Sequence, residues 1–207
     1  MSKRWVPVAV VALVLASVAS LSACRRGSNS SPAPTGVHAS LPTPARPARL
    51  GEELVTNGTF ATVQPGDATL PAGWTRYQST SRTVLLVKEA GASVLQTRND
   101  ARRKLWQEVM QHIPGLRASG RYQVTFEARV QNTVPGFVAV IEQRFGAPET
   151  NLARLSFSDR NWTAHQFVFE ATSGTLGAVS LLLGPEQPGN PDGVAEFRRV
   201  SLREVLP

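Results

Sequence analysis

Short runs in which apolar and polar residues alternate fill the chain from residue 51 onward. The clearest run covers residues 122–130, where Tyr, Val, Phe, Ala and Val alternate with Gln, Thr, Glu and Arg. This period of two predicts a β-strand that is buried on one face. Comparable runs of strand-forming residues lie at 74–78, 83–88, 93–97, 105–113, 137–145, 153–157, 162–170, 177–184 and 194–205.

Clusters of Gly and Pro, the residues typical of turns, separate these runs. They lie at 65–66, 71–73, 114–115, 135–136 and in a longer loop at 184–193. Only residues 99–104 fit a helical turn. About ten strands without a long amphipathic helix predict an all-β fold, with one domain over 51–207. A two-sheet sandwich and a barrel both fit this pattern.

The first 23 residues have the layout of an export signal. A positive start precedes an apolar stretch at 5–19, which is shorter than the ~20 residues of a membrane span. The stretch is followed by Leu-Ser-Ala-Cys at 21–24. This ending resembles the lipobox of bacterial lipoproteins, which implies cleavage before Cys24 and lipidation of its thiol. An ordinary secretory signal is the alternative. Arg25, in place of Asp, resembles the pattern for outer-membrane sorting in a Gram-negative cell.

Residues 24–50 show neither a helical nor a strand period and contain five prolines at 32, 34, 42, 44 and 47. Such a composition predicts a disordered tether between the lipid anchor and the folded domain. The tether and the signal also explain the charge of the chain. Residues 1–50 hold six basic and no acidic residues, so residues 51–207 hold 16 basic and 15 acidic ones. A nearly neutral domain argues against binding to nucleic acid.

Few residues of this chain could carry catalysis or hold a metal. Cys24 is the only cysteine, and His38, His112 and His165 lie far apart. An internal disulfide and a zinc cluster are therefore excluded. The nucleophile elbow, the HExxH motif, the P-loop and the dinucleotide fingerprint are all missing from the sequence. We expect no cofactor and no enzymatic activity.

Several segments in order along 51–207 resemble one family. The opening Leu-Val-Thr-Asn-Gly-Thr-Phe at 54–60 and Pro-Ala-Gly-Trp at 71–74 are similar to the first motifs of jelly-roll carbohydrate-binding modules. The segments at 105–109, 120–126, 161–169 and 196–202 resemble that family's later motifs. The resemblance implies a two-sheet antiparallel jelly roll of about 8–10 strands, related to the galactose-binding-like sandwiches, and a carbohydrate ligand.

The closing strand departs from the family. The family places acidic residues there that often help to hold a structural calcium, but this chain has Arg198 and Arg199. Guanidinium groups cannot ligate Ca²⁺, so we expect the usual calcium site to be missing. Phe197 and Val200 both look like core residues although they are three positions apart. An extra residue is needed for both to point inward, which predicts a β-bulge near Arg198 and Arg199.

Two aromatic residues are candidates for stacking on a sugar ring. Trp106 has the parity of Glu108 and Met110, and it is exposed on a sheet if Leu105 and Val109 face the core. Packing of Trp106 under a loop is the alternative. Tyr77 is the second candidate, on a strand at the rim. Trp74 and Trp162 lie in scaffold motifs of the family and are expected in the core.

Polar candidates come from the outward row of the strand at 122–130, namely Gln123, Thr125, Glu127 and Arg129. Gln143, on the run at 137–145, could join them. Glu127 and Arg129 with Gln143 would provide directed hydrogen bonds to sugar hydroxyls. The alternative is a solvated sheet face with a weak cross-strand Glu–Arg pair.

Taken together, these patterns predict a monomeric, membrane-anchored lipoprotein of the cell envelope, in the outer membrane if the cell is Gram-negative. Its β-sandwich would capture a polysaccharide or oligosaccharide without catalysis. The alternative is a structural or protein-interaction lipoprotein whose sandwich has no sugar ligand.

Overall fold

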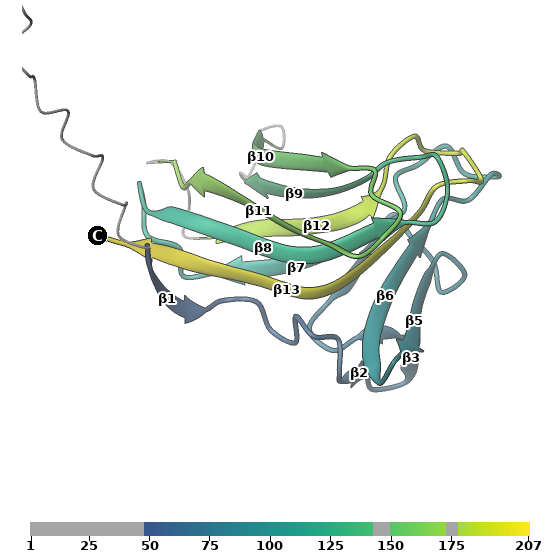
Figure 1. Cartoon of the computed structure of the whole chain (residues 1–207), viewed down its shortest axis with the longest axis horizontal. Helices are drawn as coiled ribbons and strands as arrows, with labels where there is room; N and C mark the ends of the chain where they lie inside the picture. Colours follow the sequence, from purple (N-terminus) through teal and green to yellow (C-terminus); the bar gives the residue numbers. More distant parts are fainter. Residues whose placement is uncertain (1–47, 143–149, 173–177) are drawn as a thin grey trace, which may run out of the picture. The chain divides into compact units, whose positions relative to one another are not determined.

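The computed structural model describes residues 48–142, 150–172 and 178–207. The chain divides into two units, Met1–Pro44 and Ala45–Pro207, and every described residue lies in the second (Figure 1). All regular structure in the described residues is β-strand, which confirms the all-β prediction. In chain order the strands are β1 (Arg49–Glu53), β2 (Val63–Gln64), β3 (Asp67–Pro71), β4 (Thr75–Tyr77), β5 (Val84–Glu89), β6 (Ala92–Arg98), β7 (Glu108–Pro114), β8 (Arg121–Val130), β9 (Gly136–Glu142), β10 (Thr150–Phe157), β11 (Thr163–Glu170), β12 (Ala178–Pro185) and β13 (Val194–Leu206).

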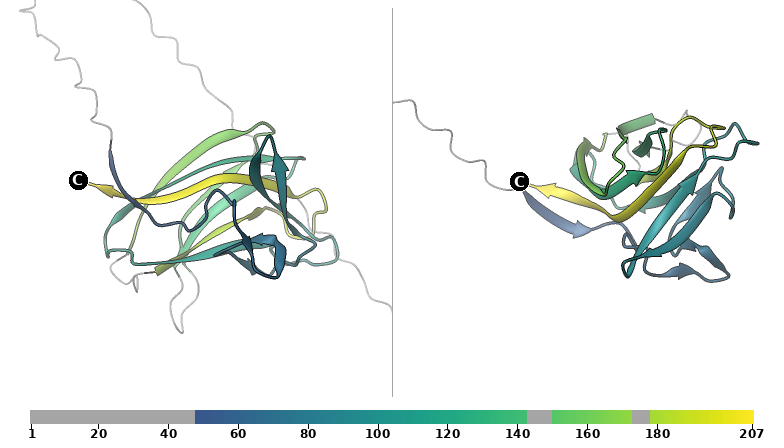
Figure 2. Two further views of the ribbon diagram at one scale, coloured as in Figure 1. Left: turned by 90° about the horizontal axis from the view of Figure 1, so that it is seen from below. Right: turned by 45° about the vertical axis from the view of Figure 1, so that its right-hand side comes forward.

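These strands form a sandwich of two antiparallel sheets and a small hairpin. The six-stranded sheet has the order β11-β8-β13-β6-β5, and β1 also pairs with β13. The five-stranded sheet has the order β10-β9-β12-β7-β4, and β2 pairs with β3. Figure 2 shows the two layers from two further directions. Because consecutive strands cross between the layers, residues far apart in sequence become neighbours within each sheet.

Alternation along β8 places one face of the six-stranded sheet in the core. Its residues from Tyr122 to Val130 alternate between buried and half-buried positions, as the period of two predicts. The buried set packs against the inward side chains of β9 and β12, such as Val138 and Leu183, which have no exposed surface. One continuous apolar core therefore holds the two sheets together.

The long strand β13 carries the predicted bulge. Arg198 lies opposite Glu127 of β8, and Ser201 lies opposite Thr125, so β13 advances three residues while β8 advances two. Arg199 is the extra residue, and its φ of 54° lies in the left-handed region. The bulge allows Phe197 and Val200 both to be buried, which confirms the reason given for expecting it.

The opening motif builds the loop that covers one end of the core. The ring of Phe60 meets the ring of Trp74 edge-on, with centroids 5.4 Å apart, and both residues are buried. Gly58 has no Cβ, and a Cβ at this position would lie 1.9 Å from the carbonyl oxygen of Val200. The side chain of Asn57 hydrogen-bonds to the backbone of the same loop. Trp74 is thus a core residue, as expected.

Two details of the pattern differ from expectation. Residues 99–104, where a helical turn was predicted, contain a hydrogen-bonded turn that is not assigned as helix. In it the N–H of Arg103 donates to the carbonyl of Asp100 over 3.0 Å. The short strands β1, β2 and β3 were not among the predicted runs. β1 begins at Arg49, two residues inside the segment assigned to the tether. These three strands have two to five residues each and few apolar side chains, so they do not stand out as runs.

Candidate functional site

The outer face of the five-stranded sheet carries a second apolar cluster. Phe137, Ala139 and Ile141 of β9 and Leu182 of β12 form its buried part. Three half-buried residues pack against them, namely Tyr77, Trp106 and Met110. Since β9 is buried along its whole length, it presents apolar side chains both to the core and to this outer face. A solvated sheet face usually carries polar residues there, so this face has the character of a binding surface.

A groove of about 340 Å³ lies over this cluster. We call it the aromatic groove, and its lining residues are Tyr77, Gln78, Trp106, Glu108, Phe137, Ala139, Ile141, Asn151, Arg154 and Leu182. They come from β4, β7, β9, β10 and β12 and from the segments beside β4 and β7, so the groove extends across strands of the sheet. Rings and directed polar groups thus meet in one place, as small-molecule sites require.

Trp106 is positioned by its neighbour Gln107. The side chain of Gln107 is fully buried, and its amide nitrogen donates to the carbonyl oxygens of Gln78, Leu105 and Trp106. These bonds hold the chain just before β7, so that the indole of Trp106 meets the ring of Phe137 edge-on at 5.5 Å. Trp106 is therefore half-buried on the outer face rather than fully exposed.

Leu105 does not meet the condition under which Trp106 would be exposed on the sheet, because half of Leu105 is exposed and it does not face the core. The strand β7 begins only at Glu108, and before that point the period of two does not hold. The parity of Trp106 and Met110 is nevertheless as predicted, since both pack on the same outer cluster. Val109 is buried in the core.

Arg154 of β10 is the cation of the aromatic groove. Its guanidinium carbon lies 3.8 Å from the ring centroid of Phe137 and 5.2 Å from that of Trp106. An ion pair of 2.8 Å joins it to Glu186, which also accepts a hydrogen bond from the hydroxyl of Ser156. About a third of the Arg154 side chain remains exposed. Stacking and pairing hold its planar group at the edge of the groove.

Tyr77 and Glu108 lie opposite one another on β4 and β7. Glu108 is buried, and the space for its side chain depends on Gly184, where a Cβ would lie 2.9 Å from the Glu108 Cγ. A carboxyl group, a phenol ring and an indole ring therefore line one end of the aromatic groove. Two of these three residues, Tyr77 and Trp106, were predicted as site residues from sequence.

Glu127 and Arg129 lie elsewhere, on β8 in the six-stranded sheet. Glu127 binds the guanidinium groups of Arg198 and Arg199, at 2.6 Å each. Burial raises the pKa of Glu127, but these two hydrogen bonds outweigh it and leave the pKa below its usual value. The polar row thus belongs to a different face from the predicted aromatic residues.

Arg129 is part of a cluster with Trp162. It pairs with Glu89 at 2.6 Å and with Glu196 at 2.5 Å. Burial lowers the pKa of Arg129, but these ion pairs raise it above its usual value overall. The ring of Trp162 lies 4.5 Å from the guanidinium of Arg129 and 4.2 Å from that of Arg198. Trp162 is therefore half-buried on the outer face of this sheet, and its assignment to the core was wrong.

Two predicted residues, Gln143 and Cys24, lie outside the described residues. The strand that precedes Gln143, β9, belongs to the sheet of the aromatic groove rather than to that of Glu127. Sequence reasoning did not select Phe137, Asn151 or Arg154 as site residues. The parity of the run at 137–145 marked the face on which Phe137 lies, but it did not show that β10 would bring Arg154 beside it.

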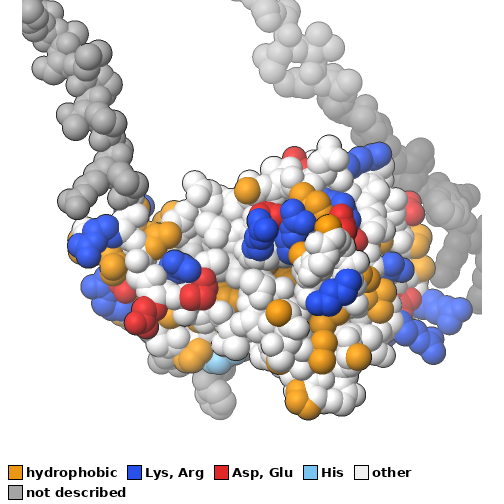
Figure 3. Space-filling model, turned by 60° about the horizontal axis from the view of Figure 1, so that its bottom comes forward, with side chains coloured by type: hydrophobic (Ala, Val, Ile, Leu, Met, Phe, Trp, Pro, Cys, Tyr) orange, Lys and Arg blue, Asp and Glu red, His pale blue; other side chains and the backbone are white. Residues whose placement is uncertain are grey.

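Three further observations concern metal ligands, surface charge and membrane-spanning segments. Within the described ranges, no group of three or more His, Cys, Asp or Glu side chains could hold a metal ion. The expected loss of the family's calcium site stays a prediction. On the face seen in Figure 3, basic and acidic side chains are interspersed rather than gathered by sign. The residues that the structure describes contain no helix long and apolar enough to span a bilayer.

Comparison with known proteins supports the fold through structure rather than sequence. No family model matches the chain, and no curated protein matches it. Among solved structures, the CBM22-1 xylan-binding domain from Paenibacillus barcinonensis Xyn10C has a TM-score of 0.53 at 17% identity, covering 77% of this chain and 99% of that one. TmCBM61, solved with β-1,4-galactotriose, has a TM-score of 0.50 at 17% identity, covering 73% and 98%.

An arabinose-bound MgGH51 α-L-arabinofuranosidase also matches, with a TM-score of 0.56 at 16% identity. The aligned region covers 75% of this chain but only 27% of that one. The structural neighbours thus include carbohydrate-binding modules of several kinds. At these identities the likeness defines the fold. The chain is a jelly-roll β-sandwich of the class found in carbohydrate-binding modules, as the sequence motifs implied.

Proposed function

We propose that this protein binds a polysaccharide or oligosaccharide, without catalysis, in the aromatic groove of the five-stranded sheet. The observation that carries the proposal is the meeting of Tyr77 and Trp106 with Arg154 and Asn151 on one apolar sheet face. Rings offer apolar faces to the C–H side of a sugar, and guanidinium and amide groups donate hydrogen bonds to its hydroxyls. The fold shared with carbohydrate-binding modules supports the same function.

The positions of the side chains in the aromatic groove assign a separate role to each of them. Arg154 covers the ring of Phe137 at 3.8 Å, so Phe137 serves as its support. Trp106 and Tyr77 are the rings that a sugar would contact. Asn151 is exposed on β10, where its amide can donate and accept hydrogen bonds. The groove is open, which suits a section of a chain as well as a chain end.

Titration of the detergent-purified full chain with neutral oligosaccharides tests the proposal. Xylo-, galacto- and cello-oligosaccharides form the panel, and calorimetry gives the affinity. Trp106→Ala is expected to weaken binding about fivefold or more, because a buried aromatic contact contributes over about 1 kcal/mol. Trp162→Ala removes the same type of side chain from the other sheet and should leave the affinity unchanged.

Other results would decide against the proposal. If no oligosaccharide binds to the folded protein, the alternative of a protein-interaction lipoprotein becomes the better one. If both tryptophan variants bind as the wild type does, the sugar site lies outside the aromatic groove. Release of new reducing ends from a bound oligosaccharide would contradict the non-catalytic role.

We further propose that the sandwich is held at a membrane of the cell envelope by lipid on Cys24. The signal-like segment, the lipobox-like ending and the proline-rich tether support this part of the proposal. Two or more acyl chains give firm anchoring, whereas one chain binds only reversibly. In cells fed labelled palmitate, the wild type should carry label and fractionate with membranes. Cys24→Ser should lose the label, and a labelled Cys24→Ser protein would contradict the assignment.

A further inference from the structure

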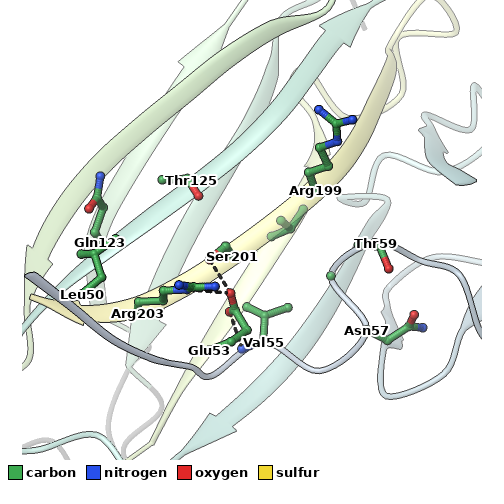
Figure 4. Close-up of a pocket in the computed structure, with 12 residues that line it drawn as sticks. Leu50, Glu53, Val55, Asn57, Thr59, Gln123, Thr125, Arg199, Ser201 and Arg203 are labelled. Atoms are coloured by element: carbon green, nitrogen blue, oxygen red, sulfur yellow. Dashed lines mark hydrogen bonds and ion pairs between the residues drawn. The ribbon is translucent and has the colours of Figure 1, made fainter. Parts of the chain in front are cut away.

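A polar depression lies on the outer face of the six-stranded sheet. Two adjoining hollows of about 500 Å³ and 480 Å³ share Thr125 and Arg199. Together they form a shallow passage over β13, β8 and β11, which we call the Arg199 trough. Figure 4 shows side chains of β1, β8 and β13 around the first hollow. The polar side chains on these three strands are Glu53, Gln123, Thr125, Arg199, Ser201 and Arg203.

The bulge in β13 presents Arg199 to solvent. As the extra residue, Arg199 has a φ of 54°, and 69% of its side chain is exposed. One guanidinium nitrogen, Nη1, binds Glu127 at 2.6 Å. Arg203 follows on the same face of β13, with Ser201 between them, and 44% of its side chain is exposed. Two guanidinium groups therefore stand along one edge of the trough.

The carboxylates of the trough already have hydrogen-bond partners within the protein. Glu53 accepts hydrogen bonds from the backbone N–H groups of Val55 and Leu202 at 3.0 and 2.9 Å, and from the side chains of Ser201 and Arg203. Burial raises the pKa of Glu53, but these four hydrogen bonds lower it below the usual value overall. Glu127 is engaged in the same way by two arginines.

Hydrogen-bond donors remain in excess. Arg203 binds Glu53 through Nε alone, and Arg199 binds Glu127 through Nη1 alone. Their other N–H groups have no partner among the residues that the structure describes. Two arginines, Arg199 and Arg203, and two glutamates, Glu53 and Glu127, line the two hollows, so their charges balance while guanidinium donors stay unused. Unused guanidinium N–H groups complement a ligand that is rich in acceptors, and carboxylate groups fit their paired geometry.

The trough differs in kind from the aromatic groove. None of the residues that line its larger hollow is aromatic. In the smaller hollow Phe126 is buried and its ring stacks on that of His165, with centroids 5.2 Å apart. Amide and hydroxyl groups of Gln123, Thr125 and Ser201 line the larger hollow instead. Planar guanidinium groups bind carboxylates through two parallel hydrogen bonds. We propose that the Arg199 trough is a second binding site, specific for the carboxylate groups of an acidic oligosaccharide and independent of the aromatic groove.

The test compares an acidic ligand with its own neutral form. The probes are a galacturonate oligomer and the same oligomer as its methyl ester, titrated into the detergent-purified full chain at low salt. The acid is expected to bind at least about tenfold more tightly than the ester. Arg199→Gln and Arg203→Gln should each weaken binding of the acid about two- to tenfold, the range for partly exposed ion pairs. Raising the salt should weaken it as well.

Two matched variants separate this site from the rest of the molecule. Arg102→Gln removes one positive charge from an exposed position outside the trough and should bind the acid as the wild type does. Trp106→Ala should bind neutral ligands more weakly but retain the acid, so failure of one site leaves the other measurable. The proposal is overturned if acid and ester bind equally, if the acid does not bind, or if Arg199→Gln and Arg203→Gln match the wild type.

Discussion

Glu196 is the most deeply buried carboxylate of the six-stranded sheet's ion-pair network, and we predict that its removal destabilises the sandwich. It lies on β13, opposite Gln96 of β6 on one side and Arg129 of β8 on the other. Only 2% of the residue is exposed. Its Oε1 accepts hydrogen bonds from Gln96 at 2.6 Å and Gln131 at 2.8 Å, and its Oε2 accepts one from Arg129 at 2.5 Å.

The size of the effect follows from these contacts. Removing one partner of a buried ion pair costs about 3–5 kcal/mol when the remaining charge is left unpaired. In Glu196→Gln, Arg129 keeps its ion pair with Glu89 at 2.6 Å, which reduces the cost. The new amide group would also point a donor at existing donors. We therefore expect the free energy of unfolding to fall by about 2–3 kcal/mol and the Tm to fall by roughly 4–12 °C.

Urea unfolding at pH 7, followed by tryptophan fluorescence, measures this change. Glu89→Gln is the matched control, since it removes the other carboxylate from Arg129 at a position that is 39% exposed. The control should cost less than about 1 kcal/mol. Equal destabilisation by the two variants, or a smaller effect in Glu196→Gln, would refute the view that buried pairing at Glu196 joins the three strands.

Three further outcomes are expected. Because the folded-state pKa of Glu127 is lowered, its ionised form adds stability that is complete above about pH 4.5 and is lost as the pH falls. Glu127→Gln should therefore show a shallower loss of Tm between pH 5 and pH 3, about the acid range of carboxylates. Gly58→Ala should prevent folding, as judged by circular dichroism, since its Cβ would lie 1.9 Å from a backbone oxygen. Gly66→Ala, with open space around it, should cost about 1 kcal/mol from its positive φ. Tyr122→Phe should lower stability by about 1 kcal/mol in urea unfolding, because the phenol oxygen accepts the N–H of Arg117 at 2.6 Å.

The strands themselves were largely predictable. The run at 122–130 became β8 with one residue added at its start, because a half-buried strand must alternate. The bulge at Arg199 was also predictable, since Phe197 and Val200 could not both be buried without it. The hairpin of β2 and β3 was not, because two short segments stabilised by a turn and by β5 leave no period in the sequence.

The candidate site was predictable only in part. Trp106 and Tyr77 were found because aromatic residues at the outward parity of a strand are conspicuous. Glu127 and Arg129 were combined with them, yet they lie in the other sheet. The alternation of residues along a strand indicates which of them face away from the core, but a sandwich has two outward faces. The sequence contains no local signal that says which of the two a given strand contributes to.

Local residue patterns determined by themselves that this chain forms β-strands, which side of each strand is buried, and where turns and a bulge interrupt them. They did so because alternation, glycine and proline act over a few residues. Only the tertiary structure decided which strands are neighbours. It placed Arg154 on the ring of Phe137 and joined Arg129 to Glu196 across 67 residues of chain. Those contacts arise from the pairing of distant strands, and that pairing depends on how the whole core packs.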